Sequence, residues 1–123
     1  MTDPAAEAAR AAAVILAPDL GPGLPAEVEA ALYVRENEEP RRGHFDFGLT
    51  LAAATLIVTI AQLAWSIYSD RRRREDTEPT SESVTREVRI SLHEQQTALP
   101  DGTDRIAEVV VTEVIRLGKD SVS

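Results

Sequence analysis

The side chains best suited to catalysis or metal binding in this chain are two histidines, His44 and His93, and the acidic pair Glu38–Glu39. The histidines lie on opposite sides of a long apolar segment, so one chain cannot bring them into one site. His93 precedes Glu94 but has no third ligand at a metal-binding spacing. The acidic pair lies in a polar linker, which offers no burial to tune a catalytic carboxyl group. We therefore predict no catalytic residue, no metal and no cofactor.

Motifs and composition narrow the function classes further. The chain has no phosphate-binding loop, no dinucleotide-binding motif and no zinc-protease motif, and its serines lack a histidine arrangement. It has no cysteine, which excludes a disulfide framework and a thiolate metal site. The net charge of −8 argues against a nucleic-acid partner. These observations predict a non-enzymatic protein.

The chain is organised around residues 48–69, GLTLAAATLIVTIAQLAWSIYS, which contain no charged residue and no proline. As an α-helix this segment would be roughly 33 Å long, against roughly 30 Å for the hydrocarbon core of a bilayer. Both flanks are densely charged, and no other segment has this character. We predict a single transmembrane helix and a location in the inner or plasma membrane.

Small and polar residues follow one line along this segment, at alternating intervals of four and three. They are Gly48, Ala52, Thr55, Thr59, Gln62, Ser66 and Ser69. Membrane helices pack through such seams, because close backbone approach replaces a hydrophobic drive. The seam predicts a helix–helix interface between copies of the chain, and hence a homo-oligomer. Alternatively, the hydroxyl groups satisfy the backbone of their own helix.

Aromatic and basic residues flank the segment in positions that suit a membrane protein. The interfacial aromatics would be Phe45, Phe47, Trp65 and Tyr68. Four consecutive arginines, Arg71, Arg72, Arg73 and Arg74, follow directly after Asp70. Such a run is typical of the cytoplasmic side of a span and can contact anionic head groups. It predicts a cytoplasmic C-terminus and membrane lipid as a partner.

Two short helices are predicted before the span. Residues 4–17 are rich in alanine, with Pro18 and a Gly-Pro-Gly turn to end the helix. Residues 25–37 have an amphipathic pattern. The second is predicted as a surface helix, although it could instead dock a partner.

The C-terminal flank contains two further elements. Val88, Ile90 and Leu92 alternate with polar residues, which predicts a half-buried strand whose open edge pairs with a partner. Residues 104–117 have Thr103 before them and Gly118 after them, which favours a helix. Their β-branched residues leave a hairpin strand as the alternative.

The predicted fold class is mainly α, with one long transmembrane helix, short N-terminal helices and a C-terminal strand-loop-helix element. The predicted parts are an acidic helical region at 1–43, the transmembrane helix with its interfacial ends at 44–70, a basic and then polar linker at 71–83, a β-α element at 84–118 and a tail at 119–123.

The order of these features resembles small accessory single-pass membrane proteins of bacterial defence and conflict systems. The resemblance is carried by HFDFGLTLAAATLIVTIAQLAWSIYSDRRRR, by residues 85–92 and by TDRIAEVVVTEVIRL. It implies an adaptor that accompanies an effector. We predict a membrane adaptor that self-associates through its span and presents residues 84–118 to a protein partner. The alternatives are a small pore-forming or holin-like protein, and a soluble complex subunit whose apolar helix is buried in a protein core.

Overall fold

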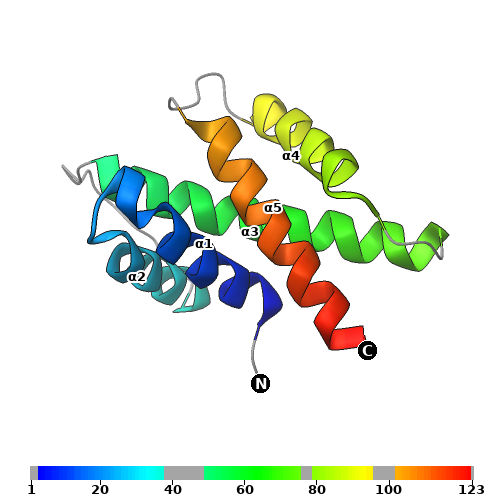
Figure 1. Cartoon of the computed structure of the whole chain (residues 1–123), viewed down its shortest axis with the longest axis horizontal. Helices are drawn as coiled ribbons and strands as arrows, with labels where there is room; N and C mark the ends of the chain where they lie inside the picture. Colours follow the sequence, from blue (N-terminus) through cyan, green and yellow to red (C-terminus); the bar gives the residue numbers. More distant parts are fainter. Residues whose placement is uncertain (1–2, 38–48, 76–78, 96–101, 123) are drawn as a thin grey trace.

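The computed structural model describes residues 3–37, 49–75, 79–95 and 102–122, without the side chains of a few helix-end residues such as 49–52. These ranges form five α-helices and contain no strand (Figure 1). The helices are α1 (Pro4–Leu20), α2 (Leu24–Asn37), α3 (Leu49–Glu75), α4 (Ser81–Gln95) and α5 (Thr103–Val122).

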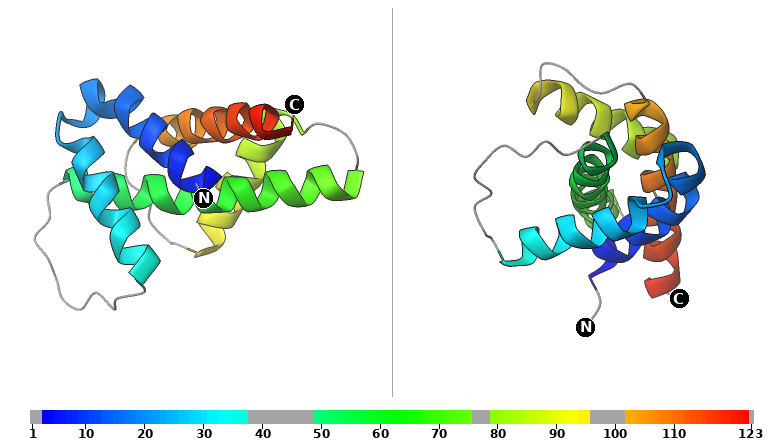
Figure 2. Two further views of the ribbon diagram at one scale, coloured as in Figure 1. Left: turned by 90° about the horizontal axis from the view of Figure 1, so that it is seen from below. Right: turned by 90° about the vertical axis from the view of Figure 1, so that its left-hand side faces the viewer.

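Helix α3 is the central element and packs against each of the other four helices. Helices α1 and α2 lie against its N-terminal part, and α5 lies between α1 and α4 (Figures 1 and 2). Ion pairs join the neighbouring helices at the surface: Arg10 to Glu29 at 2.6 Å and Arg105 to Asp19 at 3.2 Å. These exposed pairs contribute little stability, so the bundle depends on its apolar core.

Helix α1 packs through alanine. Its buried alanines are Ala5, Ala6, Ala8, Ala9, Ala12 and Ala13. Such small side chains let the backbones of α1, α3 and α5 approach closely. The helix begins where the Asp3 carboxylate accepts a hydrogen bond from the Ala5 amide at 3.1 Å. It continues past the predicted end through Pro18 to Leu20, where the Gly21 amide donates to the Ala17 carbonyl at 2.7 Å.

The prediction of a transmembrane helix is wrong. Among the described residues, no helix combines the length and the apolar character that crossing a membrane requires. Most of the apolar side chains of α3 that the structure describes are buried against protein instead, and Ile57 and Ile60 are fully buried. An apolar helix suits the centre of a bundle as well as a bilayer, and here four packed helices supply the apolar surroundings.

Predictions that depended on the span are corrected with it. The single-pass location in the inner or plasma membrane, with a cytoplasmic C-terminus, rested on that helix. The membrane adaptor rested on it too, and so did the pore-forming alternative. The remaining alternative, a complex subunit whose apolar helix is buried in a protein core, agrees with the observed packing of α3.

The predicted strand is also wrong, because residues 81–95 form helix α4. The Thr80 hydroxyl accepts a hydrogen bond from the Ser83 amide at 3.2 Å and so caps its first turn. Val84, Val88 and Leu92 recur every fourth residue and are fully buried. The alternation that predicted a strand covers only five residues, from Val88 to Leu92. Its first and last residues are also four positions apart, which is about one turn of an α-helix.

The preference for a helix over residues 104–117 is confirmed, because they lie within α5. This helix does not end at Gly118 but continues to Val122. The fold class is therefore all-helical over the described residues, without the predicted strand-loop-helix element.

Candidate functional site

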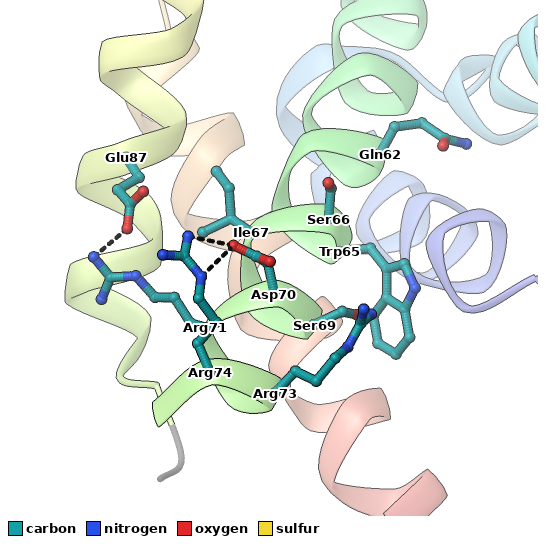
Figure 3. A pocket seen from close by; sticks show the side chains of 10 residues that line it. All are labelled: Gln62, Trp65, Ser66, Ile67, Ser69, Asp70, Arg71, Arg73, Arg74 and Glu87. Atoms are coloured by element: carbon teal, nitrogen blue, oxygen red, sulfur yellow. Dashed lines mark hydrogen bonds and ion pairs between the residues drawn. The ribbon is translucent and has the colours of Figure 1, made fainter. Parts of the chain in front are cut away.

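An open pocket of about 620 Å³ lies beside the C-terminal part of α3, where α4 passes close to it (Figure 3). Its lining is largely polar and consists of Gln62, Trp65, Ser66, Ile67, Ser69, Asp70, Arg71, Arg73, Arg74 and Glu87. Nine of these ten residues belong to α3, so the geometry of one helix decides which side chains lie together.

The pocket has two sides with different character. Gln62, Ser66, Ser69 and Arg73 are spaced by four, three and four residues, so they share one face of α3. Trp65 lies next to this face. Figure 3 shows that Arg73 extends on the side of α3 that carries Trp65. We call these five residues, Gln62, Trp65, Ser66, Ser69 and Arg73, the Arg73 face. Arg71 and Arg74 lie on the other side, toward α4 (Figure 3).

The four consecutive arginines point in different directions, because each residue turns an α-helix by about 100°. Arg71 forms an ion pair with Glu87 of α4. Arg74 donates from Nε and Nη2 to Oδ2 of Asp70, at 3.1 and 2.7 Å. Two of the arginines that were predicted to contact a membrane surface therefore form ion pairs within the protein: Arg71 binds Glu87 of α4, and Arg74 binds Asp70 one turn earlier on α3.

Arg72 is engaged by α5. Its Nη1 donates to the Tyr68 hydroxyl at 3.4 Å and to the Gly118 carbonyl at 3.5 Å. Its guanidinium also lies 5.7 Å from the centre of the Tyr68 ring, within the range of a cation–π contact. Arg72 therefore connects the ends of α3 and α5.

Arg73 differs from the other three arginines. It is exposed, and no hydrogen bond or ion pair engages its guanidinium within the described part of the chain. Its charge acts on Asp70: the hydrogen bond from Arg74 lowers the pKa of the Asp70 carboxyl, and the charges of Arg74 and Arg73 act in the same direction against the desolvation of that group. Arg73 is therefore the arginine of this pocket that has no such contact among the described residues.

The predicted seam lies on the least covered side of α3. Thr55 and Ser66 are exposed, and Thr59, Gln62 and Ser69 are half-buried. Gly48 lies outside the described residues, as does the side chain of Ala52. Gln62, Ser66 and Ser69 belong to the pocket. A helix–helix interface between copies along this seam stays a prediction.

The predicted interfacial aromatics do not form one group. Phe45 and Phe47 lie outside the described residues. Trp65 is half-buried, and its ring centre lies 5.9 Å from that of Tyr68, with an angle of 31° between the ring planes. Tyr68 is buried, with 1% of its surface exposed. These two rings therefore belong to the packing of the bundle, and Trp65 also reaches the pocket.

The residues of the predicted partner strand lie on two sides of α4. Val88 and Leu92 face the core, whereas Ile90 is 52% exposed. His44 lies outside the described residues, and His93 is exposed on α4. Within the described ranges no three acidic or histidine side chains are placed to hold a metal ion.

Ile67, Asp70 and Glu87 are the pocket residues that sequence analysis did not assign to a site. The spacing of Asp70 and Arg74, four residues apart on one helix, could have indicated their pairing. No local signal connects Arg71 with Glu87, because their contact depends on how α4 packs on α3.

A second open pocket, of about 520 Å³, includes Arg86, Arg89 and Glu108. There Arg89 already pairs with Asp104 and Glu108.

In comparisons with known proteins the chain matches no family model, no curated protein and no solved structure.

Proposed function

We propose that this chain is a non-catalytic subunit of a protein complex, which binds a partner protein through the Arg73 face. The observation that carries the proposal is that the exposed Arg73 and the half-buried Trp65 line the same open pocket. Tryptophan and arginine are enriched among the residues that dominate protein–protein binding energy. The pocket is also open, which suits a protruding side chain of a partner better than a buried small substrate.

The use of α3 supports the proposal. Most of its described apolar residues are buried in the bundle, and its described polar residues are exposed or half-buried. A rigid helix that is held on several sides presents its remaining face in one conformation, which lowers the entropy cost of binding.

The test is site-specific crosslinking of the full chain in the cells that produce it. A photoreactive amino acid replaces Ser69 on the Arg73 face or, as a matched control, Thr112 on the exposed side of α5. We expect a crosslinked product with a second protein from position 69, absent from position 112 and suppressed by Arg73→Glu. Equal products from both positions, or none from position 69, would contradict the proposal. A crosslink between two copies alone would favour the predicted homo-oligomer instead.

A further inference from the structure

We propose that the Arg73 face recognises a carboxylate side chain next to an apolar residue, in an acidic segment of the partner. This inference rests on the proposed function and names the chemistry that the face accepts. The charges around Arg73, the hydrogen-bond donors on the same face and the position of Trp65 support this chemistry.

Charge is the first argument. The pocket contains three arginines and two carboxylates, and two of the arginines are paired: Arg71 with Glu87 and Arg74 with Asp70. The pocket therefore keeps one positive charge, that of Arg73, although the whole chain has a net charge of −8. A guanidinium presents parallel N–H groups that match the two oxygens of a carboxylate, and such charge-assisted hydrogen bonds are among the stronger ones in proteins.

Neighbouring donors are the second argument. The hydroxyl groups of Ser66 and Ser69 and the amide group of Gln62 lie on the same face of α3, at successive turns. They can donate to, or accept from, the backbone of a peptide that lies along the helix. Trp65 adds an apolar surface and an indole N–H group, and its contact with Tyr68 holds the ring. An acidic residue with an apolar neighbour therefore matches both parts of the face.

The single tryptophan of the chain makes the test direct, because Trp65 lies in the proposed site. The full protein is titrated with the synthetic peptide acetyl-Gly-Leu-Glu-Glu-Leu-Gly-amide, and the fluorescence of Trp65 is followed at low salt. The glutamine version of the peptide is the matched control. We expect saturable binding of the glutamate peptide, which weakens as salt is added.

Variants assign the interaction to Arg73. Arg73→Gln is expected to weaken binding of the glutamate peptide about tenfold or more, and Arg73→Lys is expected to keep part of it. Arg86→Gln makes the same charge change on the exposed side of α4, outside this pocket, and should leave binding unchanged. Circular dichroism confirms that each variant is folded.

Two results would overturn the inference: equal binding of the glutamine peptide, or equal losses in Arg73→Gln and Arg86→Gln. A positive crosslink at position 69 together with any of these results would keep the partner-binding function and reject the carboxylate chemistry. No crosslink at position 69 would reject the function itself.

Discussion

The α-carbon of Gly118 lies directly against the ring of Tyr68. A β-carbon at position 118 would be 2.4 Å from Cε2 of this ring and 2.8 Å from Cζ, so only glycine fits without a shift. Tyr68 is buried, and Arg72 contacts both its hydroxyl group and the carbonyl oxygen of Gly118. Glycine is present here for close packing of α5 on α3, within a helix that continues beyond it.

Gly118→Ala should destabilise the protein, although alanine is the better helix former. Overpacking of a core contact costs about 1 to 3 kcal/mol, whereas the better helix propensity of alanine gains about 1 kcal/mol. The cost of overpacking exceeds this gain over most of its range. Chemical denaturation measures the change in the free energy of unfolding. Gly23→Ala is the control, because nothing lies within 4 Å of a β-carbon there. Greater stability of Gly118→Ala than of Gly23→Ala would show that the two helices do not meet at this point.

Ile57→Ala tests whether α3 is buried in the protein. Ile57 is fully buried, so its truncation should cost about 2 to 5 kcal/mol of unfolding free energy. Thr55→Ala, on the exposed side of the same helix, should change it by less than about 0.5 kcal/mol. Urea denaturation of the purified chain compares the two variants. Equal stability of both would place Ile57 outside a packed core.

Val88→Asp and Ile90→Asp distinguish the observed helix from the predicted strand. In a strand these two side chains share a face, so both substitutions would be similarly harmful. In α4 Val88 is fully buried and Ile90 is 52% exposed. We therefore expect Val88→Asp to unfold the protein or to raise its sensitivity to heat strongly, and Ile90→Asp to cost less than about 1 kcal/mol. Similar melting curves for the two variants would favour the strand.

The titration of Asp70 tests the ion pair at the pocket. Because Arg74 lowers the pKa of Asp70 in the folded protein, the pair stabilises the fold at pH values above the unfolded pKa of the carboxyl group. This stabilisation is lost as the pH falls through the folded pKa. Carbon-13 NMR of the side-chain carboxyl should give a midpoint below that of an ordinary aspartate. Arg74→Gln should raise it, and Arg73→Gln should raise it less; no change in either variant would contradict the pairing.

Local patterns predicted most of the helices but not their surroundings. The alanine-rich segment of α1 and Thr103 at the start of α5 act within a few positions, so they can be recognised without tertiary contacts. Gly118 was expected to end α5 but lies inside it, packed against Tyr68. The alternation at Val88, Ile90 and Leu92 was too short to separate two periods. It was resolved by burial of Val88 and Leu92 against neighbouring helices.

The candidate site was predicted in part. The polar line through Gln62, Ser66 and Ser69 follows from spacing alone, and the same spacing continues to Arg73. Which arginines remain available depends on partners far away in the sequence, such as Glu87 and Gly118. Sequence position could not show these pairings, because they exist only once α4 and α5 are packed on α3.

By itself, the sequence determined that residues 48–69 avoid water and that their polar side chains lie along one line, because both properties follow from residue type and helical period. It did not determine what replaces the water. The tertiary structure decided that four other helices of the same chain cover the apolar sides of α3. A bilayer and a protein core offer an apolar helix similar surroundings, so only the packing of distant segments could distinguish them.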